Sequence, residues 1–514
     1  MKLKKLTEAD IRNRVPKKIY CYEKSLPHLF QFCHTYGMED RIFRIIDDNA
    51  RQQGVFRLNG REVLVTGPES LEQEDFSDSM VLITSDYHRE VYEKLCRIPA
   101  LCRALDTIYY FADQETEYEN AYREFYKNRE LEDLILFRSG PHASSYVKGM
   151  DYADNARALF EYMLKGGYNR KYKLVWLVKE PRQFDHIAQK HENVFFVSFD
   201  WSVSEEQEKR DAYYRALCLA KYIFMTDAYG FARNCRPDQI RVQLWHGCGF
   251  KTRVNFVRCE KRYEYTTVIS ALYAKIHQDI YGLREDQVLI TGYAKEDWLF
   301  HPIPEMWDRL SIPRSEKCIF WLPTFRMAKE GLGLLNEYEL EGQTGLPVVD
   351  TREKLEELDR LLGELNLTLV IKLHPFQKPE SIRLMESRHL VLLDNDLLVE
   401  KDIQINQLLG WADGLISDYS SAAIDYLLLD RPIGFTLEDV EEYGESRGFV
   451  FAPIRDWIPG AELFSFADFC SFVREIGRGM DSAREKRQRL KKVMHAYGDD
   501  QSCRRILQAL RIQI

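Results

Sequence analysis

Polar residues gather directly after several short apolar stretches, at positions where the parallel strands of an α/β sheet carry their chemistry. In the first group, an apolar stretch ends in His246 and continues through Gly247 and Gly249 to Lys251. Glycines permit a tight, exposed turn whose N–H groups face an anion, and a nearby lysine adds a full positive charge. This group predicts a phosphate-binding turn with His246 at the rim of a cleft.

A second histidine, His374, ends another apolar stretch, residues 369–373, in a later part of the chain. A single histidine at a strand end is more often structural than catalytic. Two histidines carried by two facing sheets can converge on one ligand and share its acid–base chemistry. We therefore expect His246 and His374 to act at one site.

A third group, residues 414–425, combines a strand, a turn rich in hydroxyl groups and the start of a helix. Asp418 or Ser420 can cap that helix, and the free N–H groups at its start form a phosphate site to which Ser420 and Ser421 add hydroxyl groups. Asp425 lies about one turn further on, where it is suited to hold a hydroxyl of a ribose or polyol. The same pattern also fits a plain helix cap without a ligand, and this alternative stays open.

Two arginines complete the candidate set. Arg326 follows Thr324 just after an apolar stretch, and its planar guanidinium suits phosphate oxygens. Arg447 follows a predicted acidic helix, residues 437–445, and either closes over a bound donor or forms a surface ion pair. No acidic or histidine-rich cluster predicts a metal site, and these cations can neutralise a phosphate themselves. We therefore expect no cofactor and no obligatory metal.

The elements that position these groups alternate between short apolar stretches and longer amphipathic ones, which is typical of parallel sheets covered by helices. The chain has 514 residues, whereas a single hydrophobic core rarely grows beyond about 300 residues. An α/β protein of several domains is therefore expected. We predict a small degenerate Rossmann-like domain (residues 1–115), a helical connector (116–133), an N-terminal lobe (134–312) and a C-terminal lobe (313–514).

Strands are expected in all three domains. They cover residues 18–22, 44–46, 63–66, 81–84 and 107–111 in the first; 134–137, 174–178, 194–197, 222–226, 242–244 and 268–270 in the second; and 318–322, 367–373, 390–393, 414–417 and 432–435 in the third. The first strand is followed by Tyr22-Glu23-Lys24-Ser25, which lacks the glycines of a dinucleotide site. Ligand binding is therefore expected between the two later sheets.

The composition excludes several classes of protein. A formal net charge of −9 argues against non-specific binding of nucleic acid. No stretch approaches the ~18–20 apolar residues of a membrane-spanning helix, and the start of the chain lacks a secretion signal, so we expect a cytoplasmic protein. The eleven cysteines contain no Cys-x-x-Cys pair, which is typical of reduced thiols.

One basic stretch stands apart from this acidic composition. It runs from Arg484 to Lys492 and is followed by Arg504, Arg505 and Arg511. It is either a solvated helix face or a weak landing patch for anionic lipid headgroups.

Taken in order, these motifs resemble the CDP-glycerol glycerophosphotransferase family, which comprises teichoic acid polymerases and primases. The resemblance covers about residues 134–455. It rests on residues 151–155, the Trp-His-Gly turn with Lys251, Thr291-Gly292, residues 323–326, His374-Pro375, residues 417–421 with Asp425, residues 429–432 and residues 447–449. Cys248-Gly249 and residues 294–297 (Ala-Lys-Glu-Asp) depart from the family's Thr-Pro and Pro-Arg-Asn-Asp.

The resemblance implies a GT-B-like pair of lobes with the donor between them, and a lipid-linked acceptor at the cytoplasmic face of the membrane. It makes His246 and His374 the two important histidines. The donor side then comprises Lys251, Thr324, Arg326, Ser420, Ser421, Asp425 and Arg447, and the acceptor side Asp154, Asn155 and Gly247.

Our hypothesis is that an acceptor hydroxyl attacks CDP-glycerol and releases CMP, with His246 as the base and His374 at the leaving phosphate. A nucleotide-sugar-dependent glycosyltransferase or epimerase and a non-catalytic scaffold that retains the cleft are the alternatives. Glycerol or ribitol as the polyol, one addition or many, and teichoic acid or capsule as the product stay open, as do the task of residues 1–130 and the oligomeric state.

Overall fold

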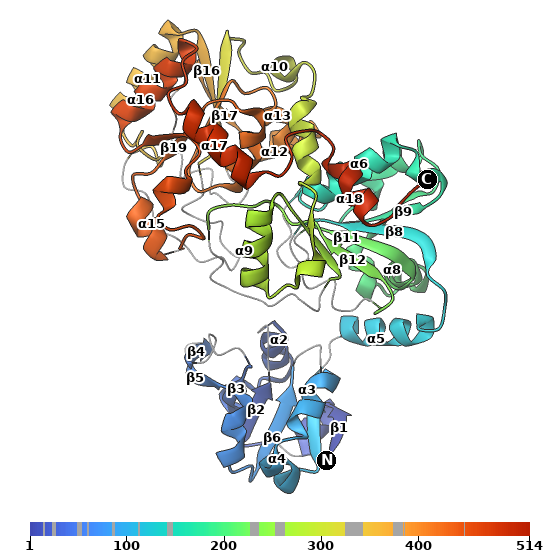
Figure 1. The fold of residues 1–514 in the computed structure, drawn as a ribbon. Coiled ribbons are helices and arrows are strands. Elements are labelled where there is room, and N and C mark those ends of the chain that lie inside the picture. Colours follow the sequence, from blue (N-terminus) through green and yellow to red (C-terminus); the bar gives the residue numbers. More distant parts are fainter. Residues whose placement is uncertain are drawn as a thin grey trace. The chain divides into compact units, whose positions relative to one another are not determined.

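The structure is a computed structural model of the chain. It describes residues 1–13, 16–22, 27–48, 54–58, 61–84, 88–111, 114–140, 148–226, 236–251, 263–323, 343–373, 384, 386–446 and 448–514. These residues form two compact units, residues 1–125 with 202–205 and residues 126–201 with 206–514 (Figure 1). Four predicted site residues, Thr324, Arg326, His374 and Arg447, lie outside the described residues.

The first unit contains one seven-stranded sheet in the order β1-β7-β6-β2-β3-β5-β4. Its strands are β1 (Lys2–Lys5), β2 (Lys18–Tyr22), β3 (Ile42–Ile46), β4 (Gly54–Leu58), β5 (Arg61–Thr66), β6 (Ser79–Ile83) and β7 (Thr107–Tyr110). Its helices are α1 (Glu8–Asn13), α2 (Pro27–Tyr36), α3 (His88–Leu95) and α4 (Pro99–Ala104), followed by α5 (Gln114–Tyr126). The five strands expected in this part of the chain are all present.

Two strands of this sheet, β1 and β4, escape the sequence pattern because both lie at its edges. β1 has the sequence Lys-Leu-Lys-Lys and alternates half-buried with exposed residues. β4 pairs only with β5, in antiparallel register. An edge strand has one neighbour and is partly solvated, so it does not need the continuous apolar run that marks an interior strand.

The second unit contains two sheets, in the orders β10-β9-β8-β11-β12-β13-β14 and β17-β16-β15-β18-β19-β20. The strands of the former are β8 (Glu132–Arg138), β9 (Lys173–Val178), β10 (Val194–Ser198), β11 (Ala220–Met225), β12 (Ile240–Gln243), β13 (Tyr265–Val268) and β14 (Val288–Ile290). Those of the latter are β15 (Lys317–Trp321), β16 (Leu367–Lys372), β17 (Leu390–Leu393), β18 (Gly414–Ser417), β19 (Ile433–Thr436) and β20 (Ala461–Leu463). The three sheets confirm the predicted α/β class.

Helices connect these parallel strands. They include α6 (Asp154–Lys165), α7 (Asp185–Ala188), α8 (Gln207–Leu219), α9 (Ala271–Tyr281), α10 (Met306–Arg309), α11 (Arg352–Glu364), α12 (Asn395–Glu400), α13 (Ile405–Leu409), α14 (Ser421–Tyr426), α15 (Val440–Ser446) and α16 (Phe466–Gly477). The connector helix expected over residues 116–133 is α5, which ends at Tyr126, and Glu132 already begins β8. The remaining boundaries between domains stay predictions.

The two sheets of the second unit share one apolar core. Trp245 and Val268, which follow or belong to strands of the first of these sheets, lie in the same buried cluster as Phe320 and Val370 of β15 and β16. A parallel sheet covered on both faces needs apolar residues on both, and β8 and β16 are buried along almost their whole length. The turns after these strands are therefore held by a rigid interior.

The last helix, α18 (Ser502–Ala509), packs beside α6, in the lobe whose sheet contains β8 (Figure 1). Cys503, Ile506 and Leu507 lie in one buried cluster with Phe137 of β8. The predicted boundary at residue 313 places this helix in the C-terminal lobe, whereas its apolar side chains belong to the core of the preceding lobe. The end of the chain thus ties the two sheets together.

The basic stretch forms α17 (Arg484–Met494), whose cations divide into two groups. Arg487 is fully buried and bonds to Asp430 and Asp481, whereas Arg484, Arg489 and Lys492 are exposed. No helix in the described part of the chain is long and apolar enough to cross a bilayer.

Asp297 anchors the start of α18 and offers a test of this packing. Its carboxylate accepts the N–H groups of Ser502 and Cys503 at 2.8 and 2.9 Å. Asp297→Ala leaves both buried donors without an acceptor, so we expect the free energy of unfolding to fall by about 1–2 kcal/mol, measured by urea denaturation. The matched control Asp286→Ala removes an exposed carboxylate and should leave the denaturation midpoint unchanged; equal midpoints for both variants would contradict this role.

Candidate functional site

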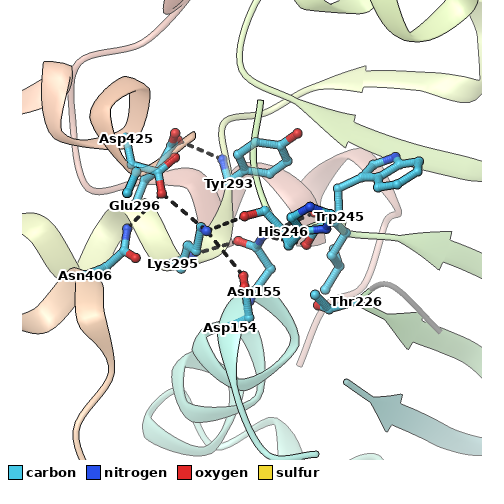
Figure 2. A network of polar contacts seen from close by, with 12 residues as sticks. Asp154, Asn155, Thr226, Trp245, His246, Tyr293, Lys295, Glu296, Asn406 and Asp425 are labelled. Carbon is cyan, nitrogen blue, oxygen red and sulfur yellow. Dashed lines mark hydrogen bonds and ion pairs between the residues drawn. The ribbon is translucent and has the colours of Figure 1, made fainter. Parts of the chain in front are cut away.

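A buried lysine, Lys295, lies at the centre of a polar network between the two sheets of the second unit (Figure 2). It belongs to the 3₁₀ helix η9 (Ala294–Phe300), which follows β14. Its ammonium group donates a hydrogen bond to the main-chain carbonyl of His246. The same group lies 3.5 Å from Oδ1 of Asp154 and 3.3 Å from Oδ2 of Asp425. One cation therefore holds the histidine turn and two carboxylates.

The partners of Lys295 come from both lobes. Asp154 begins α6, in the lobe that contains β8, and its main-chain N–H donates to Oε1 of Gln404 at 3.0 Å. Asp425 lies in α14 of the other lobe, where the amide of Asn406 donates to its Oδ2 at 3.2 Å. The contacts of Lys295 with Asp425 and of Asp154 with Gln404 join the two lobes, and Asn406 supports Asp425. The network therefore fixes how the strand ends of one lobe meet those of the other.

Asn155 shapes the turn that carries His246. Its amide group donates to the carbonyl of Trp245 at 2.8 Å, and its Oδ1 accepts the main-chain N–H of Lys295 at 3.0 Å. The side chain is 1% exposed, so these protein contacts use it fully. Asn155 therefore holds the turn in place by linking Trp245 to Lys295.

The turn itself requires glycine at its centre. Trp245 has φ +56° and Gly247 has φ +149°, both in the positive region that L residues avoid. A Cβ on Gly247 would lie 2.7 Å from Oγ and 2.8 Å from Cβ of Ser421. The histidine turn thus packs closely against the start of α14, which brings His246 and Ser421 to one place.

The network holds more carboxyl groups than cations. Burial tends to lower the pKa of Lys295, but Asp154 and Asp425 raise it above its ordinary value. Burial also raises the pKa of Asp154 to about 6, although Lys295 opposes the shift. The pKa of Glu296 is raised well above its usual range, first by burial and then by Asp425. Lys295 therefore keeps its charge, and the raised pKa means that Glu296 holds its proton to higher pH than an exposed glutamate does.

His495 is consistent with a proton on Glu296. Its ring is buried, and its Nε2 lies 2.8 Å from the carbonyl of Ile424, to which it must donate. Burial lowers the pKa of His495 to about 4, so the ring is neutral and its Nδ1 is an acceptor. This Nδ1 faces Oε1 of Glu296 at 4.0 Å.

Two more predicted residues, Ser420 and Lys251, lie at the same junction. Ser420 caps α14, with its Oγ accepting the N–H of Ala422 at 3.3 Å. Lys251 forms an antiparallel bridge with Phe449, and its ammonium lies 5.6 Å from the ring centre of Tyr443. The Gly-rich turn is therefore joined to the segment that directly follows position 447.

The structure brings together only part of the predicted set. His246, Gly247, Ser421, Asp154 and Asp425 meet through Lys295 and the turn. Asp425 is 1% exposed and bonded within the protein, so in this conformation it supports the network and does not face an open surface. Because His374, Thr324, Arg326 and Arg447 fall outside the described residues, the meeting of the two histidines stays a prediction.

Sequence reasoning missed Lys295, Glu296 and Asn406 as parts of this network. A signal for the first two exists, since Lys-Glu-Asp at 295–297 places three charged residues shortly after Thr291-Gly292, with Tyr293 and Ala294 between them. The strand before them, β14, has only three residues, and so short a strand gives no clear pattern that would mark 295–297 as a strand end. Within the described ranges, no group of three His, Cys, Asp or Glu residues could hold a metal ion.

Comparison with known proteins gives one family. The family model for CDP-glycerol:poly(glycerophosphate) glycerophosphotransferase matches residues 132–511. The chain is 26% identical over 320 residues to the teichoic acid ribitol-phosphate polymerase TarK of Staphylococcus aureus, covering 58% of this chain and 57% of that protein. It is 22% identical over 407 residues to a teichoic acid glycerol-phosphate transferase of the same species, covering 74% and 92%.

A solved structure gives the same result for the fold. The wall teichoic acid polymerase TagF matches with a TM-score of 0.57 and 18% identity, over 83% of this chain and 96% of that one. At this identity the likeness supports the fold alone. The chain spans less than two thirds of the length of TarK, so the activities of that protein do not transfer directly.

Because the network holds one cation and several carboxyl groups, it predicts a large loss of stability when Lys295 is replaced and a small one when Glu296 is replaced. Lys295→Met leaves the buried carboxylate of Asp425 and the half-buried one of Asp154 without their cation, so we expect the free energy of unfolding to fall by about 3–5 kcal/mol. Glu296→Gln keeps a neutral side chain whose oxygen can still accept the N–H of Tyr293, so the loss should be about 1 kcal/mol or less. Chemical denaturation at pH 7 measures both.

Lys275, exposed and paired with Asp279 on α9, provides the matched lysine control, and Lys275→Met should behave as wild type. If Glu296→Gln is as damaging as Lys295→Met, Glu296 is ionised and our account of the network is wrong.

Proposed function

Because the chain belongs to the CDP-glycerol:poly(glycerophosphate) glycerophosphotransferase family, we propose that it transfers glycerol phosphate from CDP-glycerol to a hydroxyl of a lipid-linked teichoic acid or capsular polymer. The family match over residues 132–511 carries this proposal. The geometry supports it, because a glycine turn bearing His246 and Lys251 packs against the serine-capped start of α14. Such a junction suits a phosphorylated donor.

Glycerol is the polyol we favour over ribitol. The family description names glycerophosphate, and the glycerol-phosphate transferase of Staphylococcus aureus matches over 92% of its length. The match to the ribitol-phosphate polymerase TarK spans only 57% of that protein. The lobes that face one another across the network would then correspond to the two halves of a GT-B-like enzyme.

The proposed reaction is a displacement at the phosphorus that bears the glycerol. The acceptor oxygen forms a bond to this phosphorus, the bond to the CMP oxygen breaks, and the acceptor proton passes to the imidazole of His246. His374 holds or protonates the departing CMP. Phosphoryl transfer of this kind depends mainly on positioning and on neutralising charge, so the cationic residues carry most of the electrostatic work.

The remaining predicted residues take roles around the donor. We place Lys251, Thr324, Arg326, Ser420, Ser421 and Arg447 at the donor phosphates. Asp425 acts through Lys295, to which its carboxylate is bound. Asp154, Asn155 and Gly247 form the side on which we place the acceptor, with Asn155 acting indirectly because it is buried beneath the turn.

We place the reaction at the cytoplasmic face of the membrane, where a lipid-linked acceptor lies. The exposed cations of α17, Arg484, Arg489 and Lys492, would contact anionic headgroups, each contributing about 1 kcal/mol. Arg487 is excluded from this role because it is buried against Asp430 and Asp481.

The catalytic role of His246 predicts a loss of turnover without a loss of fold. His246→Ala removes the base, so kcat for CMP release should fall by about 10²–10⁴. The Lys295 contact is to the main-chain carbonyl of His246 and survives this substitution, so the thermal midpoint should stay near that of wild type. Turnover like that of wild type would remove His246 from the mechanism.

Donor choice tests the function itself. Incubation with CDP-glycerol, CDP-ribitol or a UDP-sugar and a lipid-linked acceptor analogue should release CMP from CDP-glycerol and extend the acceptor by glycerol phosphate units, detected by mass spectrometry. We also expect activity to persist in EDTA, because the protein's own cations balance the phosphates. UDP release would favour a sugar transferase, and EDTA-sensitive activity restored by magnesium would show that a metal is required.

A further inference from the structure

Lys372 is a partly buried lysine at the end of β16. Among the described residues, no acceptor lies within hydrogen-bonding or ion-pair distance of its ammonium group. Burial lowers its pKa to about 8, and no carboxylate opposes this shift. Other inward lysines of the same lobe behave differently: Lys317 donates to the carbonyl of Ile476 at 2.6 Å and Lys491 to that of Leu428 at 2.6 Å.

The strand register fixes the face of the sheet on which Lys372 lies. Ile371 pairs with Trp321 of β15, which in turn pairs with Ile416 of β18. These three residues share one buried cluster, so they point to the same face. Side chains alternate along a strand, and the next row therefore points to the opposite face; it consists of Lys372, Leu322 and Ser417.

That opposite face turns toward the other lobe. Leu322 and Val370 lie in the buried cluster that also contains Trp245 and Cys248 of the histidine turn. Ser417 ends β18 and donates its hydroxyl to the carbonyl of Leu322 at 3.1 Å. Since two strand spacings separate β16 from β18, Lys372 stands about 10 Å from the strand that leads to the serine pair.

An unpaired cation at such a place is costly to the fold. A partly buried charge without a partner loses hydration and gains no ion pair in return. Perturbed groups of this kind at the carboxyl edge of an open α/β sheet are typical of ligand sites. The face, the edge and the lack of a counterion in the described part of the chain together indicate that an anion from outside the protein completes the contact.

We infer that Lys372 binds the diphosphate of a nucleoside-diphosphate donor, on the side of the cleft opposite the turn of His246. This inference rests on the proposed function, because it assigns a new residue to the same donor. It adds a cation that neither the motifs nor the histidine pair had indicated. Lys372 is two residues before His374, so both would approach the donor from the end of one strand.

Binding of CDP and stability, measured on the same variants, test this inference. Lys372→Met removes the contact, so calorimetric titration should show CDP binding about ten- to hundredfold weaker than wild type. Because the same substitution removes an unbalanced charge, the variant should be at least as stable as wild type in urea. The control variant is Lys317→Met. Lys317 begins β15, so it lies at the end of the strands opposite to Lys372, and this variant should bind CDP as wild type does.

Each outcome is decisive. Unchanged CDP binding in Lys372→Met overturns the inference whatever its stability. If binding and stability both fall, Lys372→Arg decides: restored binding supports a charge contact, and binding that stays weak shows a packing role. If wild-type protein binds UDP but no CDP, the proposed function fails, and the inference then stands or falls on whether Lys372→Met weakens UDP binding. If both wild type and Lys372→Met bind CDP equally well, only the inference fails.

Discussion

The buried contact between the Lys295 ammonium and the main-chain carbonyl of His246 is the constraint on which the site depends. Carboxylate partners offset the cost of burying a lysine, and here one partner comes from each lobe. The contact therefore links the position of a strand-end histidine to the position of the opposite lobe. Substituting Lys295, Asp154 or Asp425 therefore affects both.

The two lysines contrast in a way that follows from their partners. Lys295 is matched by carboxylates and holds the protein together, whereas Lys372 has no described counterion and lies on the face of its sheet that turns toward the same junction. A charge that is paired inside the protein supports the structure. A partly buried charge with no described partner at the carboxyl ends of the strands is typical of a ligand site. The presence or lack of a described partner thus distinguishes a supporting lysine from a proposed binding lysine, even though no substrate is bound.

The sequence predicted most of the sheets, because interior parallel strands are continuous apolar runs that end abruptly in polar turns. It missed β1, β4, β14 and β20, which are edge or very short strands. At the site it found His246, Gly247 and Ser421 from their strand-end positions. It did not find Lys295, whose carboxylate partners Asp154 and Asp425 lie more than a hundred residues away in the chain. Nor did it find Asn406, whose contact with Asp425 joins two separate helices of one lobe. Asp425 was expected to contact a polyol, which stays a prediction; the structure shows its carboxylate buried beside Lys295.

The most direct test of the account is a crystal structure of the wild-type protein with CDP bound. We predict that the diphosphate lies between the turn of His246 and the start of α14, with Lys372 and the imidazoles of His246 and His374 turned toward it. A diphosphate bound at another surface, with the two imidazoles far apart and no closure able to unite them, would contradict the central claim.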